Sequence, residues 1–335
     1  MVAGPGRSGT SLFSGLVSRL GFSIPQPEVE ADRTNPRGFG EPQWAVDFHH
    51  ELLRSLQVQV DDGRPEAWEL TARVVDRPYA RRRLGDWLEE QFEHSSRVLV
   101  KDPRLAWFFE LYRATASDLG VTLRVVTMLR HPAEVTRSRE LAYGTRSSST
   151  TKVAGWLNTM LAIELLTRGL PRAAVRYDDL LTGWSSALAR AEKGLGSQLV
   201  SAASDVQLAE AGELVDHSLH RSRTDWEMLA IPTPLRELTE RTYDALQRLV
   251  EPDLTSPSDP AGSPADELDE LRAAYARYYD ECADVARSRT IAARARERRK
   301  LAHRQEQEQA RQPVRFPRRV ARALRAALSR SGPSA

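Results

Sequence analysis

The chain has 335 residues, of which 41% are hydrophobic and 28% are charged, and its formal net charge is +2. This composition is that of an ordinary globular protein, which excludes a small disulfide-stabilised scaffold and a globally disordered chain. A single cysteine allows no internal disulfide, no apolar run approaches the roughly 18 residues of a membrane span, and no secretory signal follows Met1, so we expect a cytoplasmic protein.

Predicted strands and helices alternate along the N-terminal half. Four short apolar runs have the composition of strands, at 2–3, 97–100, 123–129 and 173–177. Amphipathic stretches predict helices between them, and those at 44–56 and 84–92 should cover the ligand-binding edge of the sheet. Because the strands are apolar throughout, they favour a parallel sheet with helices on both faces. We expect an α/β fold, a three-layer sandwich around a central parallel sheet, with a C-terminal helical extension.

Residues 4–11 form a glycine-rich loop between the first predicted strand and its helix. The backbone N–H groups of such a loop can converge on an anion at the helix N-terminus. The glycine spacing matches that of nucleotide-binding loops, but Thr10 stands where Walker-type NTPases carry lysine. Arg7 supplies a cation two residues before Gly9, and its guanidinium can bind a terminal phosphate through two hydrogen bonds. The loop therefore predicts phosphate binding without ordinary ATP hydrolysis.

A second candidate anion site follows the strand predicted at 123–129. Arg130 stands at the carboxyl end of this strand, Pro132 begins the next helix, and Ser138 lies about two turns along that helix. The carboxyl ends of parallel strands meet at the edge where ligands bind. Two separate anion sites at this edge suit a nucleotide that carries phosphate at two positions.

Together, these motifs resemble the sulfotransferases that use 3′-phosphoadenosine 5′-phosphosulfate (PAPS). The segment that is similar to their 5′-phosphosulfate loop consists of Arg7, Ser8, Gly9, Thr10 and Ser11. Arg130 and Ser138 have the spacing of the pair that holds the 3′-phosphate in that family. Segments 35–41, 101–104 and 176–180 are similar to the bacterial and Golgi-type branch. The resemblance implies a P-loop-type fold, PAPS as cosubstrate, adenosine 3′,5′-bisphosphate as product and no metal.

The resemblance also implies the chemistry of the site, which is in-line sulfuryl transfer to an acceptor hydroxyl or amine. By analogy with phosphoryl transfer, positioning and charge stabilisation should do most of the work. Glu41 is the expected base, and Pro42 suggests a helix start whose positive end keeps the carboxylate ionised. His49 and His50 on the following helix are alternatives for this role. Lys101 resembles the residue that stabilises charge on the transferring group, and the expected acceptor is a carbohydrate.

Two other classes of protein remain open. A P-loop kinase for a nucleotide or small molecule would bind ATP in the loop and hold Mg²⁺ with Asp102, at the end of the strand predicted at 97–100. Such a kinase would normally carry the Walker lysine that this loop lacks. A non-catalytic adaptor in polysaccharide assembly would use the basic tail for docking. A requirement for Mg²⁺ and ATP would support the kinase.

The C-terminal part of the chain differs in charge from the rest. The residues from Arg287 onward include fifteen arginines or lysines and three glutamates, which gives a net charge of +12. The residues before Arg287 therefore carry a net charge of −10. A cluster of Pro, Ser, Asp and Gly predicts a linker before this part. The expected organisation is a sulfotransferase α/β domain at 1–251, a linker at 252–264, a helical extension at 265–312 and a basic amphipathic tail at 313–335.

Apolar residues recur every four positions in the tail, with arginines between them. They are Phe316, Val320, Leu324 and Leu328. Such a helix can lie on an anionic membrane surface or dock on an acidic partner, which would make the protein peripheral to the membrane. A solvated tail is the alternative. Interleaved aromatic residues are missing, so the expected partners are the nucleotide, a glycan acceptor and this surface, without nucleic acid.

Overall fold

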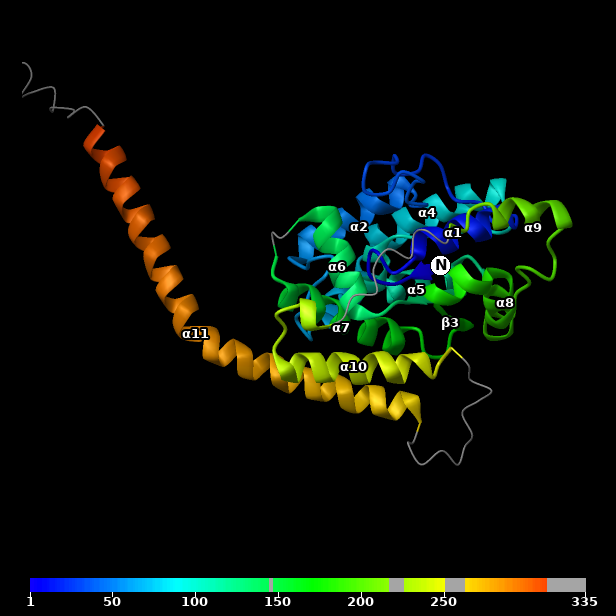
Figure 1. Ribbon diagram of the computed structural model, residues 1–335. Coiled ribbons are helices and arrows are strands. Elements are labelled where there is room, and N and C mark those ends of the chain that lie inside the picture. The colour runs from blue at the N-terminus through cyan, green and yellow to red at the C-terminus, as the bar shows by residue number, and fades with distance from the viewer. Residues whose placement is uncertain (145–146, 217–225, 251–262, 312–335) are drawn as a thin grey trace, which may run out of the picture. The chain divides into compact units, whose positions relative to one another are not determined.

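The structure is a computed structural model that describes residues 1–144, 147–216, 226–250 and 263–311 (Figure 1). The chain divides into two compact units, Met1–Tyr279 and Asp280–Ala335. The fold of the first unit is α/β and mostly helical, around a small open sheet of three parallel strands. The expected α/β class with a parallel sheet is therefore confirmed.

The strands pair in the order β1-β2-β3. They are β1 (Val2–Ala3), β2 (Val125–Leu129) and β3 (Arg172–Arg176). The register places Val2 opposite Val126, and Val125 opposite Arg172. All three lie where strands were predicted, within a few residues at each end.

The strand predicted at 97–100 is wrong in its extent. This segment and the adjoining Lys101 make only isolated parallel bridges among the described residues, from Val98 to Ser23 and from Lys101 to Val2. The N–H of Val2 donates to the carbonyl of Val100 at 3.0 Å, which places the segment beside β1. Since β1 has two residues, it offers too few partners for a longer ladder.

Helices make up most of the first unit. In chain order, the helices are α1 (Thr10–Arg19), α2 (Gln43–Leu56), α3 (Ala67–Ala72), η1 (Arg73–Asp76), α4 (Pro78–His94), η2 (Pro103–Trp107), α5 (Phe109–Asp118), α6 (Pro132–Tyr143), α7 (Ser149–Leu166), α8 (Tyr177–Leu195), α9 (Asp205–Gly212), η4 (Trp226–Met228), α10 (Thr233–Gln247) and α11 (Pro264–Arg311). The helices predicted at 44–56 and 84–92 correspond to α2 and the second half of α4.

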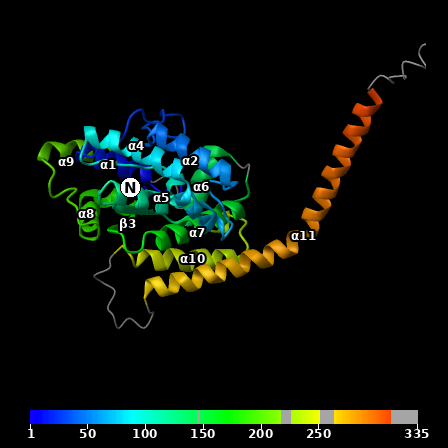
Figure 2. The same cartoon turned by 180° about the vertical axis from the view of Figure 1, so that it is seen from behind.

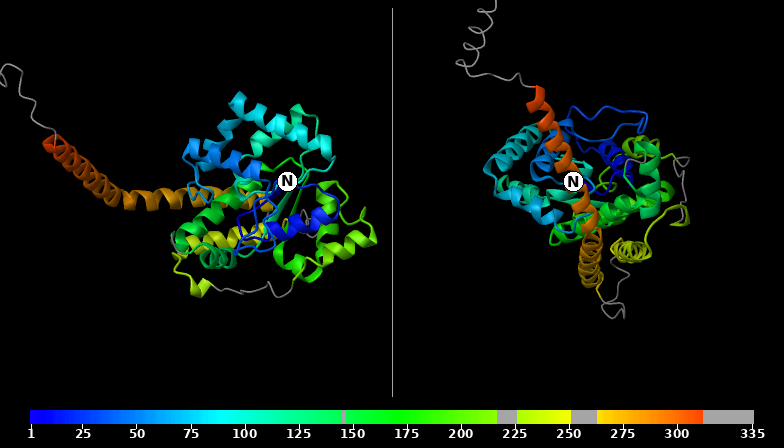
Figure 3. Two further views of the ribbon diagram at one scale, coloured as in Figure 1. Left: turned by 90° about the horizontal axis from the view of Figure 1, so that it is seen from above. Right: turned by 90° about the vertical axis from the view of Figure 1, so that its left-hand side faces the viewer.

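Two hydrophobic clusters cover the two faces of the sheet. Successive side chains of a strand point to opposite faces. Val2 and Val126 belong to one cluster, together with apolar residues of α1, α8 and α9. Ala3, Val125 and Leu129 belong to the other, together with apolar residues of α2, α4, α5 and α7. Figure 3 shows the strands with helices on both sides.

The beginning of α11 belongs to the first unit. Leu268, Leu271 and Tyr275 are buried in its larger cluster, and α10 lies beside this part of α11 (Figures 1 and 2). The expected domain ended at residue 251, whereas the compact unit extends to Tyr279.

The rest of the C-terminal part is described only as far as Arg311. From Asp280 onward, the described side chains of α11 are exposed. Most of the linker predicted at 252–264 and all of the tail predicted at 313–335 lie outside the described residues. Within the described parts of the chain, no helix has the length and apolar character to cross a bilayer.

Candidate functional site

Most of the predicted site residues follow the carboxyl ends of neighbouring parallel segments. The glycine-rich loop follows β1, Arg130 follows β2, and Lys101 ends the segment that pairs with Val2. Tyr177, which was not predicted for the site, follows β3. Because these segments are parallel, their ends meet at one edge of the sheet. The local sequence pattern of a short strand followed by a turn and a helix is what brings these side chains together.

The loop after β1 presents unused hydrogen-bond donors to this edge. The side chain of Ser8 is fully buried, and its Oγ has no hydrogen-bond partner among the described residues. Phe13 is the first residue of α1 whose N–H bonds back along the chain, to the carbonyl of Gly9 at 3.1 Å. The preceding N–H groups of the first turn have no partner within the helix. Such a group of donors suits an anion.

Gly9 is required where the loop enters α1. Its φ of 91° lies in the left-handed region. A Cβ at this position would lie 2.3 Å from Cδ2 of Tyr177, so the Tyr177 ring covers the loop closely. Burial raises the pKa of the Tyr177 hydroxyl, which keeps the ring neutral. Arg7 also has a positive φ, of 76°, an uncommon conformation for a residue with a side chain.

The two predicted anion sites are joined through Arg7. Its Nε donates to Ser138 Oγ at 3.2 Å, and Arg130 Nη1 donates to the Arg7 carbonyl at 3.1 Å. Arg130 also donates to Glu134 Oε2 at 3.0 Å and lies 4.4 Å from the centre of the Tyr177 ring. Glu134 and Tyr177 were not predicted as contacts of Arg130, because only the three-dimensional arrangement places them there.

Glu41 and Lys101 form a buried ion pair at the same edge. Lys101 Nζ donates to Glu41 Oε1 at 2.6 Å, to the Phe39 carbonyl at 3.1 Å and to Ser11 Oγ at 3.4 Å. Glu41 is 7% exposed and Lys101 is 2% exposed. Burial raises the pKa of Glu41, and the nearby charge of Lys101 opposes this effect only in part. The carboxylate is therefore more basic than an exposed glutamate.

The segment before Glu41 lies against the loop. Arg7 Nη1 donates to the Thr34 carbonyl at 3.1 Å, and Asn35 Nδ2 donates to Ser11 Oγ at 3.3 Å. Asn35 also donates to the Gly38 carbonyl at 2.6 Å, which closes its own turn. Segment 35–41 was predicted only as the carrier of Glu41, and its contacts with the loop are an addition from the structure.

Behind the ion pair lies a buried network around Asp102. A carboxylate only accepts hydrogen bonds, so His49 donates from Nδ1 to Asp102 Oδ2, at 2.7 Å. His49 Nε2 lies 3.1 Å from the hydroxyl of Tyr112. Asp102 Oδ1 accepts from the N–H and from Nη1 of Arg104, at 3.0 and 2.8 Å.

The charges of this network act on its pKa values. Burial alone would raise the pKa of Asp102, but the hydrogen bond and charge of His49 and the charge of Arg104 outweigh it and lower this pKa. Burial, then the charge of Asp102, raises the pKa of Tyr112 well above its usual value. His49 is 0% exposed and both of its ring nitrogens are hydrogen-bonded, so it does not suit the role of base, for which it was an alternative to Glu41. His50 is exposed on α2.

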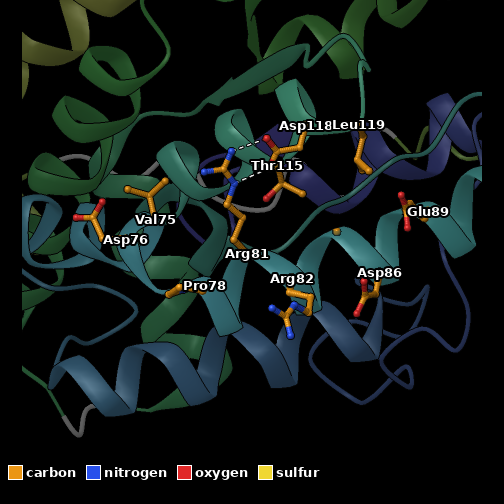
Figure 4. Close-up of a pocket in the computed structure, with 11 residues that line it drawn as sticks. Val75, Asp76, Pro78, Arg81, Arg82, Asp86, Glu89, Thr115, Asp118 and Leu119 are labelled. Carbon is orange, nitrogen blue, oxygen red and sulfur yellow. Dashed lines mark hydrogen bonds and ion pairs between the residues drawn. The ribbon is translucent and has the colours of Figure 1, made fainter.

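Two cavities lie apart from this group of residues. One of about 610 Å³ lies along α4 and α5, where Arg81 donates two hydrogen bonds to Asp118 (Figure 4). The other, of about 310 Å³, adjoins the non-helical Gly183 within α8. Of the described residues, those predicted for the site line neither cavity.

Comparisons of this chain with protein-family models, with curated proteins and with solved structures give no match. The chemistry of the site is therefore argued from its own geometry. That geometry is a loop with free donors, a buried carboxylate paired with lysine, and two arginines, Arg7 and Arg130, at the same sheet edge.

Proposed function

We propose that this chain is a sulfotransferase that transfers a sulfuryl group from PAPS to a hydroxyl or amine of an acceptor, with a carbohydrate as the expected acceptor. The observation that carries the proposal is the convergence of the residues predicted for it. Arg7, in the middle of the loop, contacts Ser138 and Arg130. Ser11, at the end of the loop, contacts Lys101, which pairs with Glu41. The proposal includes a three-layer fold of the P-loop type.

The donors of the loop fit the 5′-phosphosulfate of the nucleotide. Ser8 Oγ and the first N–H groups of α1 need acceptors, and a phosphosulfate supplies oxygen atoms that accept. Arg130 and Ser138 would hold the 3′-phosphate, because a guanidinium and a hydroxyl donate to it together. Both groups already bond to protein atoms, so the nucleotide would take over some of these hydrogen bonds.

Glu41 would act as the base in the transfer step. It would take the proton from the acceptor hydroxyl while the acceptor oxygen bonds to sulfur and the bond from sulfur to the phosphate oxygen breaks. The released nucleotide is adenosine 3′,5′-bisphosphate. Lys101 would stabilise the charge on the transferring group, and it would have to exchange part of its contact with Glu41 for this role. The raised pKa of Glu41 suits a proton acceptor.

One observation weighs against the kinase that sequence reasoning left open. That alternative needs Asp102 as a ligand of Mg²⁺. Both oxygen atoms of Asp102 instead accept hydrogen bonds, from His49 and from Arg104, and the side chain is fully buried. To bind a metal, this buried carboxylate would have to break hydrogen bonds that already satisfy it, which costs free energy. This favours the sulfotransferase.

Nucleotide recognition tests the proposal. Adenosine 3′,5′-bisphosphate should raise the melting temperature of the full chain, and adenosine 5′-monophosphate should raise it much less, because Arg130 and Ser138 would contact only a 3′-phosphate. Arg130→Ala should weaken binding of the bisphosphate by about 1.5–3 kcal/mol, the usual contribution of a hydrogen bond to a charged group. Arg81→Ala on α4 is the control and should leave binding unchanged. Equal shifts with the two nucleotides would remove the assignment.

Transfer itself is the second readout of the same test. Wild-type protein with labelled PAPS and a panel of acceptors should yield labelled product, and Glu41→Gln should lower the rate about 10²- to 10⁴-fold, the usual contribution of a general base. Retained binding of adenosine 3′,5′-bisphosphate by the variant would separate catalysis from folding. Transfer that is unaffected by Glu41→Gln would overturn the role of Glu41, and nucleotide binding without any transfer would favour the adaptor.

A further inference from the structure

Within the described residues, Arg104, next to the site, donates side-chain hydrogen bonds from Nη1 alone. A guanidinium carries five N–H groups, and Arg104 Nη1 donates one of them to Asp102 Oδ1 at 2.8 Å. Its Nε is buried and has no partner within the described residues. The side chain is 21% exposed, so it is accessible from solvent. A buried N–H without an acceptor costs free energy, and a ligand that supplies an acceptor recovers it.

The other cations of the site differ from Arg104 in which donors are engaged. All three acceptors of Lys101 are protein oxygen atoms. The Nε atoms of Arg7 and Arg130 already donate, to Ser138 Oγ and to Glu134 Oε2. Arg104 differs in that its Nε has no acceptor among the described residues.

Arg104 lies beside both the loop and the proposed base. A Cβ on Gly6 of the loop would lie 3.8 Å from Cγ of Pro103, the residue before Arg104. Lys101, three residues before Arg104, pairs with Glu41 at 2.6 Å, and the charge of Arg104 acts to lower the pKa of Glu41. The unused donors therefore belong to the same edge of the sheet as the rest of the site.

The buried network holds Arg104 in this position. Asp102 binds both the N–H and Nη1 of Arg104, and its other oxygen is held by His49 at 2.7 Å. His49 in turn contacts the hydroxyl of Tyr112 at 3.1 Å. A guanidinium anchored at one nitrogen by a fully buried carboxylate is pre-organised, so less conformational entropy is lost when its other nitrogens bind a ligand.

We propose that Arg104 is an oxyanion-binding residue that receives a sulfate-like group next to the carboxylate of Glu41. Two sources can supply this oxyanion: the sulfuryl group in transfer, or an anionic substituent of the acceptor such as a carboxylate or sulfate. The part that Arg104 plays in turnover rests on the proposed function. Its binding of an oxyanion does not.

Sulfate titration of the full chain tests the proposal. The melting temperature is followed against sodium sulfate at constant ionic strength, with and without saturating adenosine 3′,5′-bisphosphate. The variants are Arg104→Gln and Arg104→Lys. Lysine keeps the positive charge that Asp102 needs and lacks Nε with its planar geometry, so it carries the test if glutamine unfolds the protein. Arg64→Gln is the matched control, because Arg64 also donates to an aspartate two residues before it.

In the presence of the nucleotide, wild type and Arg64→Gln should show a saturable rise in melting temperature, and both Arg104 variants should lose it. Without the nucleotide, sulfate also reaches the loop, and the response of Arg104→Lys should be smaller than that of wild type. Equal sulfate responses of wild type and Arg104→Lys would overturn the proposal. Failure of the nucleotide to bind would overturn the proposed function alone, because the second titration still applies.

Kinetics distinguish the two sources of the oxyanion. If the sulfuryl group is bound, Arg104→Lys should lower kcat about 10²- to 10³-fold for neutral and acidic acceptors alike, as for removal of one oxyanion donor. If the acceptor carries the anion, the variant should raise KM for uronic acid glycans and leave their neutral counterparts unchanged. Unchanged kcat and KM for both kinds of acceptor would contradict the proposal.

Discussion

Two turns with the same local pattern use their arginines in different ways. In each, the Oδ1 of an aspartate, Asp62 or Asp102, accepts the N–H of an arginine two residues later, at 3.0 Å. Arg64 also donates hydrogen bonds from Nε to Asp62 Oδ1 at 2.9 Å and from Nη2 to Asp62 Oδ2 at 2.7 Å. Its Nη2 donates to the Gln57 carbonyl as well. Arg104 gives Asp102 only Nη1, and its Nε stays without a partner among the described residues.

The difference arises at the second oxygen of the carboxylate. Asp62 Oδ2 accepts a hydrogen bond from the N–H of Gln59 at 3.0 Å and a second one from Nη2 of Arg64. Asp102 Oδ2 is taken by the ring of His49 at 2.7 Å. The two turns thus differ in the other donor to this oxygen, which is a buried histidine ring at Asp102 and a backbone N–H at Asp62. We infer that this donor decides whether the arginine donates to both oxygen atoms of its own aspartate or keeps donors for a ligand.

Removing each aspartate should give the largest difference between the two turns. Asp102→Ala leaves His49 and the partly buried Arg104 without their acceptor, and we expect it to lower the free energy of unfolding by about 3–5 kcal/mol, as for a broken buried ion pair. Asp62→Ala should cost about 1.5–3 kcal/mol, because Arg64 is 33% exposed and can turn toward water. Urea unfolding followed by tryptophan fluorescence measures both. Equal losses would contradict the comparison.

Replacing the histidine should convert one kind of turn into the other. His49→Phe removes the donor to Asp102 Oδ2, so Arg104 can donate hydrogen bonds to both oxygen atoms of Asp102, as Arg64 does to Asp62. We expect a loss of stability of about 1–3 kcal/mol from the hydroxyl of Tyr112 left without its partner, together with a loss of the sulfate response. A merely structural role of His49 would lower stability and leave the sulfate response of the folded variant unchanged.

Sequence reasoning found those parts of the site that depend on local pattern. The glycine-rich loop, Arg130 and Lys101 each follow a short apolar run, and the ends of parallel runs meet at one edge. That rule was enough to predict that the loop, Lys101 and Arg130 lie close together before any contact was known, whereas Glu41 was predicted from the similarity of segment 35–41 to the sulfotransferases. The same local reasoning predicted the positions of the three strands and of α2.

The contacts that it missed join residues far apart in the chain. His49 and Asp102 are 53 residues apart and His49 and Tyr112 are 63 apart, and neither pair has a sequence spacing that indicates contact. The segment at 97–100 was predicted as a full strand because its composition is right, but its partner β1 is too short. The packing of Tyr275 into the first unit was missed because a helical period does not tell which body the helix contacts.

The dependence of stability on pH should give the smallest effect and separates charge from packing in the comparison. The pKa values of both Asp102 and Asp62 are lowered from 3.8 in the folded chain, where hydrogen bonds to the ionised form outweigh burial. Each carboxylate therefore stabilises the fold fully above its unfolded pKa, and this contribution is lost as the pH falls through the folded pKa. The difference in unfolding free energy between wild type and Asp102→Ala should be constant near neutral pH and should shrink below about pH 4, and Asp62→Ala should behave alike. Urea unfolding along this series measures it. If the difference in unfolding free energy between wild type and Asp102→Ala stays unchanged at low pH, Asp102 acts through packing. That result would contradict the view that the charge of Asp102 holds Arg104 in place.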